Sequence, residues 1–398
     1  MRVVSHRLNG VKRTALGAAA LPFAACLLGV LPPSLLSAQQ TPLEQTQVLQ
    51  LAAPLTVIGQ SSALPGHTLH RVMGAFRHTN GSLVIADGGS NEIRVFNAAG
   101  NLIRTMGGSG QGPENFVNLQ ALWSAPPDTI VGFDMGSQRL AYWRLHGSFV
   151  GSVNLGTEAI QVIVARFADG SYLGMRTPRP GRTPEGTSRL DSALLIRISA
   201  EGRQLNDVGR IPWETWHARR HPLAQRVMYT PSPFDGTGLV AASGSEIFHA
   251  YGTEARIRRF SLSGQSRSDI ELRVAAARLA PEVWNRWIDS RVSRLDDREG
   301  PALRRVLESL PRPSTLPLAD MLLVDDEGLL WLREFVAPGA TRASWHVVDP
   351  NGRERARLEV SATFRPLHIG AAYLVAVTRE EDDTEVVQLL AKPALRGR

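Results

Sequence analysis

The stretch GSLVIADGGSNEIRVFNAAGNLIRTMG, residues 81–107, decides the fold of this chain. It contains three short apolar strands separated by two turns that are rich in Asp, Asn and Gly, a composition typical of β-hairpins. Variants of this phrase recur about six times along the chain, at a period of roughly 40–50 residues. Such a period predicts a radial array of four-stranded sheets, in which each sheet buries its faces against its neighbours.

The repeats predict an all-β domain with six blades of four antiparallel strands each. We expect the blades at approximately residues 68–115, 116–156, 158–210, 234–275, 317–361 and 363–392. The last copy supplies only three strands before the chain ends. Because an unclosed array would leave a sheet edge without hydrogen-bond partners, we expect a strand from residues 46–58 to complete it. Two apolar segments qualify, residues 46–51 and residues 55–58.

The quoted stretch and the linker GGSGQGPENF that follows it, at residues 107–116, resemble the NHL-type β-propeller repeat. In that repeat a strand ending in Ala-Asp, an I-x-V-F strand and a G-x-G-x-G-P-x-x-F linker recur. PSPF at residues 231–234 and LLVDDEGLLW at residues 322–331 are further matches. The resemblance implies one six-bladed β-propeller over residues 39–398. It implies no particular activity, because one fold hosts many functions.

Residues 1–38 are typical of a secretory signal peptide. Four basic residues precede a largely apolar run, and Leu36-Ser37-Ala38 offers a small residue at the cleavage site. We therefore expect an exported protein, periplasmic or secreted, that begins near Gln39. Two alternatives stay open, a retained membrane anchor and a lipid on Cys26, and we expect no other contact with a membrane.

The basic net charge of the chain comes largely from this leader. Its four charged residues are all Arg or Lys, so the formal charge falls from +7 to +3 when they are removed. The high pI is then no argument for a nucleic-acid partner. The single cysteine, Cys26, also lies in the leader, so the remaining domain must be held by its core and has no disulfide.

Two interruptions of the repeat are candidate functional segments, because loops on a rigid scaffold often carry sites. Residues 211–233 are too polar and too punctuated for a strand, and we expect an irregular connector between the third and fourth blades. Its aromatic and basic side chains could stack on a ring-shaped ligand and bind an anionic group. The candidate contact residues are Trp213, Trp216, His217 and Arg220. The alternative is a connector whose two tryptophans cover the propeller.

Residues 276–312 form the second interruption, between the fourth and fifth blades. Apolar residues that include Trp284 and Trp287 recur at a spacing of three to four, which predicts a helix with Pro281 in its first turn. Gly300-Pro301 should break it, and a short second helix should follow and end at Pro311. The apolar stripe of this helical hairpin should pack on the propeller, or serve as a lid or a partner surface that uses Trp284 and Trp287.

Motifs of known catalytic chemistry are absent from the sequence. There is no H-E-x-x-H, C-x-x-C or phosphate-binding loop, and the nine histidines that follow residues 1–38 show no short-range zinc spacing. Asp87 and Asp325 stand at strand ends, where a turn needs an acidic side chain. We therefore assign no catalytic residue, metal ligand or cofactor.

Three functional hypotheses follow. The first is an exported, non-catalytic propeller that binds a protein, peptide or glycan. The second is a metal-dependent propeller enzyme similar to the lactonases and lyases, with acids and histidines around the central channel. The third is a structural component of the cell envelope, whose helical hairpin engages a membrane-protein partner.

Overall fold

The computed structural model describes residues 46–59, 66–156, 160–177, 183–224, 226–380 and 384–395. All described residues belong to one compact unit of the chain, Thr46–Arg398. The expected signal peptide, residues 1–38, and Cys26 lie outside the described residues. None of the described helices is both long enough and apolar enough to cross a membrane.

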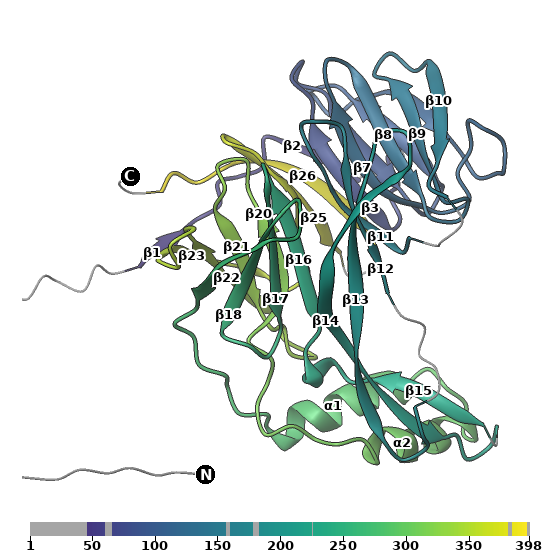
Figure 1. Cartoon of the computed structure of the whole chain (residues 1–398), viewed down its shortest axis with the longest axis vertical. Coiled ribbons are helices and arrows are strands. Elements are labelled where there is room, and N and C mark those ends of the chain that lie inside the picture. The colour runs from purple at the N-terminus through teal and green to yellow at the C-terminus, as the bar shows by residue number, and fades with distance from the viewer. Residues whose placement is uncertain are drawn as a thin grey trace, which may run out of the picture. The chain divides into compact units, whose positions relative to one another are not determined.

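The fold is all-β and is built from sheets of four or five strands, almost all of them antiparallel (Figure 1). The strands of the described residues form six sheets, which we number in chain order. The first sheet contains β3 (Val72–Arg77), β4 (Leu83–Asp87), β5 (Glu92–Phe96) and β6 (Leu102–Gly107). The second contains β7 (Leu119–Ala125), β8 (Thr129–Asp134), β9 (Arg139–Arg144) and β10 (Phe149–Asn154). The third contains β11 (Val162–Arg166), β12 (Tyr172–Arg176), β13 (Ser188–Ile198), β14 (Gln204–Arg220) and β15 (Val227–Pro231).

The remaining three sheets follow the same plan. The fourth sheet contains β16 (Gly238–Ser243), β17 (Glu246–Tyr251), β18 (Arg256–Ser261) and β19 (Ser266–Glu271). The fifth contains β20 (Ala319–Val324), β21 (Leu330–Glu334), β22 (Arg342–Val348), β23 (Glu354–Ser361) and β1 (Gln47–Leu49). The sixth contains β24 (Arg365–Ile369), β25 (Tyr373–Arg379), β26 (Glu385–Ala391) and β2 (Thr56–Ile58).

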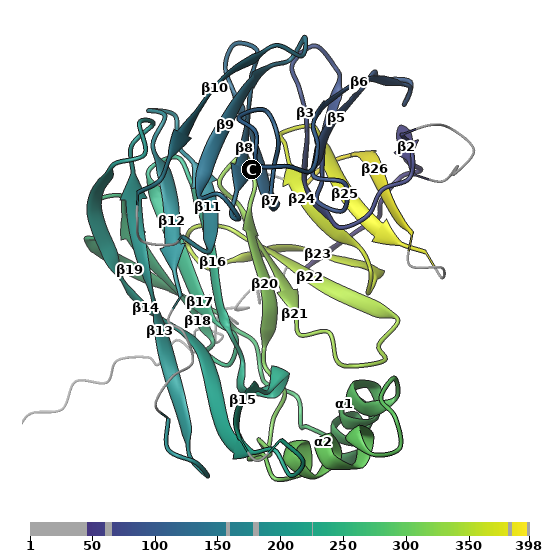
Figure 2. The same cartoon turned by 90° about the vertical axis from the view of Figure 1, so that its right-hand side faces the viewer.

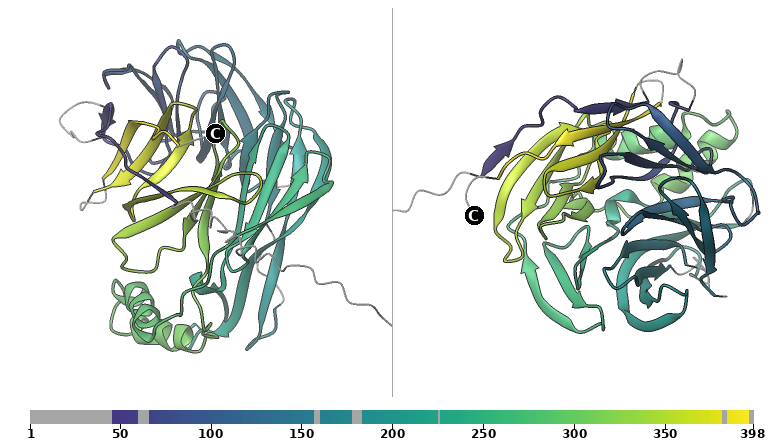
Figure 3. Two further views of the ribbon diagram at one scale, coloured as in Figure 1. Left: turned by 90° about the vertical axis from the view of Figure 1, so that its left-hand side faces the viewer. Right: turned by 90° about the horizontal axis from the view of Figure 1, so that it is seen from above.

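Apolar clusters join each sheet to the next, and the series closes on itself. The first and second sheets share a core around Phe116, and the fifth and sixth share one around Trp331 and Trp345. Equivalent clusters join the second to the third, the third to the fourth and the fourth to the fifth sheet. A further cluster, with Ile58 and Leu83 in it, joins the sixth sheet to the first. The sheets therefore follow one another around the domain (Figure 3), and strands such as β4 are buried on both faces.

The two apolar segments near the N-terminus pair with different sheets. β2 pairs antiparallel with β26, so it supplies the fourth strand that the last repeat lacks. β1 instead pairs parallel with β23, at the outer edge of the fifth sheet. Of the two segments that could complete the last repeat, the structure uses residues 55–58, and residues 46–51 protect a neighbouring edge.

The aspartates at strand ends have structural partners. The Oδ1 atom of Asp87 accepts hydrogen bonds from the backbone N–H groups of His70 and Gly89, and its Oδ2 lies 3.1 Å from a guanidinium nitrogen of Arg94. Asp325 is also buried, and its Oδ1 accepts the backbone N–H of Leu329 in the turn between β20 and β21. The interpretation of these two acids as structural agrees with their contacts.

Residues 211–233 are not an irregular connector, which corrects the sequence-based prediction. β14 is 17 residues long and extends to Arg220, well beyond the end of β12. Its distal half pairs with the start of β13 on one side, and its last residues, from Trp216 to Arg220, pair with β15 on the other. Because both neighbouring strands satisfy its backbone, the segment can be a strand in spite of its polarity. Only residues 233–235 form a short helical turn, η1 (Pro233–Asp235).

The second interruption contains two helices, α1 (Pro281–Val292) and α2 (Glu299–Glu308). Pro281 begins α1 as expected, but Gly300-Pro301 lies inside the first turn of α2, where the missing N–H of proline costs nothing. Trp284, Trp287 and Ile288 are buried, whereas Leu295 is 43% exposed. Figures 1 and 2 show that the helices lie at the same end of the domain as β15 and the distal half of β14.

Candidate functional site

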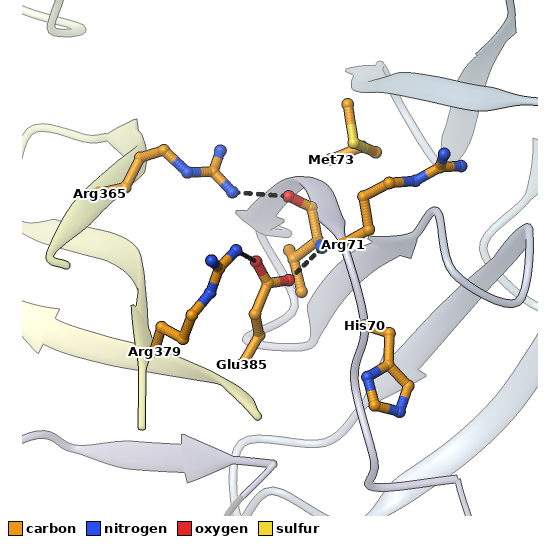
Figure 4. A pocket seen from close by; sticks show the side chains of 7 residues that line it. His70, Arg71, Met73, Arg365, Arg379 and Glu385 are labelled. Atoms are coloured by element: carbon orange, nitrogen blue, oxygen red, sulfur yellow. Dashed lines mark hydrogen bonds and ion pairs between the residues drawn. The ribbon is translucent and has the colours of Figure 1, made fainter. Parts of the chain in front are cut away.

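A pocket of about 450 Å³ opens between the sixth and first sheets, where β24 and β3 begin. Arginine side chains dominate its lining (Figure 4). The residues that line it are His70, Arg71, Val72, Met73, Arg365, Arg379 and Glu385.

Strand ends bring these residues together. Arg365 is the first residue of β24, and Arg379 and Glu385 stand directly opposite each other at the end of β25 and the start of β26. Glu385 also forms an isolated antiparallel bridge with Leu69, just before the first sheet. The bridge places the end of the β25–β26 hairpin beside the segment that leads into β3.

The peptide groups of Val72 are held from both sides. Its N–H donates to Oε2 of Glu385, and its carbonyl accepts a hydrogen bond of 2.7 Å from Nη2 of Arg365. Nη2 of Arg379 lies 3.4 Å from the other oxygen of Glu385 (Figure 4). The side chain of Glu385 is only 8% exposed, so this carboxylate is a fixed part of the wall.

Among the described residues that line this pocket, three are arginines and one is a glutamate. Burial lowers the pKa of the Arg365 guanidinium; the carboxylate of Glu385 opposes this shift, and Arg379 and Arg333 add to it. Among the described residues, the carbonyl of Val72 is the one hydrogen-bond acceptor of the Arg365 guanidinium. A partly desolvated cation of this kind gains energy from an anion beside it.

Arg71 has a left-handed backbone conformation, with φ of 54°. A non-glycine residue in this region is strained, and strained residues often stand at functional sites. Its Nη2 donates to the carbonyl of Gly88 and lies 3.1 Å from Oδ1 of Asn118. Hydrogen bonds therefore hold its guanidinium on the side of the pocket away from Arg365 (Figure 4).

The six contact residues expected from the sequence fall into separate places. Trp284 and Trp287 are 5% and 6% exposed, and both pack on Phe234 with ring centroids 5.5 Å away. They lie in the core that fixes α1 and α2 to the domain, together with Leu307 and Leu310.

The other four lie on β14. His217 is 1% exposed, whereas Trp213 and Trp216 are half-buried. Trp213 covers Gly238, where an added Cβ atom would come within 2.6 Å of the indole ring. Arg220 is exposed and forms a two-pronged ion pair with Glu185. Of the six, Arg220 alone is exposed, and none of the six lines the arginine pocket.

A second pocket, of about 390 Å³, lies between α1 and the beginning of the fifth sheet. Its wall is largely apolar and includes Trp287, Phe335 and Pro338. Asp320 supplies a carboxylate there, but Nε of Arg333 lies 2.6 Å from its Oδ1. Among the described residues, no three His, Cys, Asp or Glu side chains are grouped so that they could hold a metal ion.

Sequence reasoning missed the arginine pocket. Arg71 and Glu385 are more than 300 residues apart, as the 313-residue separation of Val72 from Glu385 illustrates. Each arginine is an isolated residue at a strand end and belongs to no motif. A usable signal would have been the repeat itself, because equivalent ends of consecutive sheets lie side by side in a closed array.

Comparisons with known proteins support the fold alone. No family model matches the chain, and no curated protein matches it. A protein of Bacteroides fragilis that is described as exported is similar in structure, with a TM-score of 0.51 and 13% identity over 87% of this chain and 96% of that one.

Weaker likenesses exist to other solved structures. A DUF4221 member from Bacteroides vulgatus has a TM-score of 0.45 and 9% identity over 87% of this chain and 98% of that one. A virginiamycin B lyase from Staphylococcus aureus has a TM-score of 0.39 and 11% identity over 81% and 86%. Identities this low carry no activity across to this chain. Together, the closed series of antiparallel sheets and the Bacteroides fragilis structure place the fold among the β-propellers.

Proposed function

We propose that the chain is an exported, six-bladed propeller of the NHL type, in which each of the six sheets is one blade and α1–α2 is an insertion between the fourth and fifth. The leader-like composition of residues 1–38 and the similarity to a protein described as exported support export. The motifs at residues 81–116 and the closure of the last sheet by β2 support the repeat assignment.

We further propose that the domain is a binding module for a protein, peptide or glycan, and that the ligand presents an anionic group to the arginine pocket. The observation that carries this proposal is the half-buried Arg365, in a pocket whose described lining has three arginines and one glutamate. A carboxylate or another oxyanion would accept from the guanidinium nitrogens of Arg365 that face the pocket and would offset the charge.

The recognised chemistry is therefore an acidic group at the end or on the side of a larger ligand. A pocket of 450 Å³ can hold a terminal carboxylate with its neighbouring residue or a single acidic sugar ring. The rest of such a ligand would extend over the surface outside. Trp216 and Arg220 stay candidate contacts for it, on the end of the domain that carries β15.

Binding of peptides with a free C-terminal carboxylate, of their amides, and of neutral and uronic-acid oligosaccharides to the chain without residues 1–38 tests the proposal. We expect the acidic probes to bind and the amides and neutral sugars to bind about tenfold more weakly or not at all. Added salt should weaken the binding of the acidic probes, because it screens their charge.

Arg365→Gln and Arg71→Gln should each lower the affinity for the acidic probes by about tenfold, because each removes a charged hydrogen-bond donor. Arg342→Gln is the matched control, since Arg342 is exposed and lies on β22, outside the pocket. Equal binding of acid and amide, or full binding by both pocket variants, would refute the proposal. Stoichiometric metal retained through dialysis would instead favour the metal-dependent hydrolase or lyase.

A further inference from the structure

Three side chains near β15 form a continuous hydrogen-bonded series. The hydroxyl Oγ of Ser188 lies 2.6 Å from Nδ1 of His217, and Nε2 of His217 lies 2.5 Å from Oδ2 of Asp235. Serine, histidine and aspartate in this order are the groups of the nucleophilic triad of acyl-transfer enzymes, which is recognised by geometry rather than by sequence position.

The fold positions each member independently of any ligand. Ser188 begins β13 and stands directly opposite His217 on β14, so the register of the two strands sets their contact. Asp235 belongs to η1, directly after β15, and its backbone N–H donates to the carbonyl of Ser232. The hydroxyl of Ser232 accepts the N–H of Phe234 and caps this turn.

The three side chains differ in exposure in the way that a nucleophilic serine requires. The side chain of Asp235 is 15% exposed and that of His217 is 2% exposed, whereas Ser188 is exposed to solvent. The orienting acid and the base are thus shielded, and the hydroxyl is accessible to a substrate.

The protonation pattern follows from the donors and acceptors. An ionised Asp235 can only accept, so Nε2 of His217 carries the hydrogen that lies between them. Nδ1 then carries the lone pair and accepts the hydroxyl hydrogen of Ser188. The ring is used in the opposite sense to that of chymotrypsin, in which serine contacts Nε2, but either nitrogen of an imidazole can act as the base.

A positive charge is held at the residue before Ser188. Arg219 follows His217 by two residues, and its Nη1 lies 3.0 Å from the carbonyl oxygen of Thr187, the neighbour of Ser188. A second bond, of 3.4 Å, joins its Nε to the carbonyl of Ser309 at the end of α2. A guanidinium held there can stabilise negative charge that develops on a substrate oxygen next to Ser188.

We propose that Ser188, His217 and Asp235 form a second functional site, which hydrolyses small carboxylic esters such as an O-acetyl group on a larger alcohol. Ser188 is exposed to solvent and lines neither of the two pockets described above. The site therefore fits a small acyl group and leaves a bulky alcohol outside. The site is separate from the arginine pocket and does not depend on it.

The reaction uses the ester and water only. Oγ of Ser188 bonds to the carbonyl carbon while its proton passes to Nδ1 of His217, and Asp235 stabilises the resulting imidazolium through Nε2–H. The ester C–O bond then breaks, and the leaving alkoxide takes the proton from Nδ1. A water molecule, deprotonated by Nδ1 of His217, then attacks the acyl carbon. The bond between that carbon and Oγ of Ser188 breaks, the carboxylic acid leaves, and the proton on Nδ1 returns to Oγ and restores the serine hydroxyl.

Labelling of the purified chain with a fluorophosphonate probe, followed by mass mapping of the modified peptide, tests the nucleophile. We expect one label on Ser188, and hydrolysis of p-nitrophenyl acetate and of O-acetylated sugars. Ser188→Ala should abolish the label and reduce hydrolysis at least about 100-fold, and Asp235→Asn should reduce both to a similar degree. Ser266→Ala, an exposed serine of β19, is the matched control and should change neither.

Ser188→Ala removes one atom from an exposed position, so the variant should remain folded, and its circular dichroism should equal that of the wild type. Arg365→Gln should keep full labelling, which separates this site from the anion pocket. Absence of a label on Ser188 in the wild-type chain, or hydrolysis that persists in folded Ser188→Ala, would overturn the proposal. The series would then serve only to fix η1 to the hairpin.

Discussion

The Nζ atom of Lys392 lies 2.7 Å from Oδ2 of Asp325, which joins the end of the sixth sheet to a turn of the fifth. The two side chains are 4% and 0% exposed. Lys392 is one of only two lysines in the chain, the other being Lys12 in the leader. Asp325 also accepts a hydrogen bond from Nε1 of Trp331, so its carboxylate is the centre of a buried network between two consecutive sheets.

Replacement of Lys392 by methionine should destabilise the domain. The variant keeps most of the side-chain volume but leaves the carboxylate of Asp325 buried without its cation, which typically costs about 3 kcal/mol. Urea denaturation of the wild type and the variant measures the difference. The double variant Lys392→Met, Asp325→Asn should recover part of the loss, and a double variant that is no more stable than Lys392→Met would contradict this account.

The same pair illustrates what the sequence can predict. Asp325 was recognisable as a turn residue because it follows an apolar strand, and the strands of the repeat were found in the same way. Its bond to Lys392 was not recognisable, because no local pattern shows which distant residue will meet a strand end. The arginine pocket was not predicted for the same reason, since Arg71 and Arg365 line one pocket only when the last sheet lies against the first.

For β14 the sequence-based prediction was wrong, because a strand was taken for an irregular connector. Its polar residues from Trp213 to Arg220 resemble a loop when hydrophobic alternation alone is considered. In the structure β13 pairs with one edge of this segment and β15 pairs with the other edge from Trp216 onward, so backbone hydrogen bonds define the strand where side-chain burial does not. A tertiary contact therefore overrides the local pattern, and it also brings His217 to Ser188.

Ile58 should anchor the strand that closes the last sheet. It is fully buried in the cluster between the sixth and first sheets, and its strand, β2, pairs with β26. Ile58→Ala should lower the free energy of unfolding by about 2–5 kcal/mol, because it removes buried methyl groups and leaves a cavity. Leu55→Ala, three residues earlier and 67% exposed in the native chain, should change it by no more than about 0.5 kcal/mol.

Deletion of the N-terminal strands should separate their contributions. Removal of residues 39–58 takes away both β1 and β2, whereas removal of residues 39–53 takes away only β1. We expect the longer deletion to lower the melting temperature of the whole domain much more, since it opens the sixth sheet. Equal melting temperatures for the two deletions would show that β2 does not close the fold.

His249 should make the domain less stable in mild acid. Burial lowers the pKa of His249 from 6.5 to about 4, although a bond from its Nε2 to the carbonyl of Pro212 opposes the shift. The unfolded chain therefore binds this proton at a higher pH than the folded one does. Its contribution to stability is complete above pH 6.5 and is lost as the pH falls toward 4, by about 2–3 kcal/mol at pH 4.5.

His249→Gln tests the origin of that loss, because glutamine can donate to Pro212 but does not titrate. Urea denaturation at pH 7 and at pH 4.5 should show a smaller difference in the variant than in the wild type. His146→Gln, at an exposed histidine in the turn after β9, is the control and should leave the difference unchanged. If all three proteins lose the same amount of stability in acid, the loss arises from groups other than His249.

Phe234 should hold the helices on the domain. Its ring is fully buried, and its centroid lies 5.5 Å from those of Trp284 and Trp287 on α1 and 5.9 Å from that of Phe335 after β21. Phe234→Ala removes the residue that these three rings share, at a cost of about 3–5 kcal/mol. Because the lost contacts belong mainly to α1, amide hydrogen exchange should accelerate first in α1 and α2 and leave β4 protected. Leu295→Ala, at a residue that is 43% exposed, should leave exchange unchanged in both helices. If Phe234→Ala accelerates exchange equally in β4 and in α1, the helices are an inseparable part of the propeller core rather than an insertion docked on it.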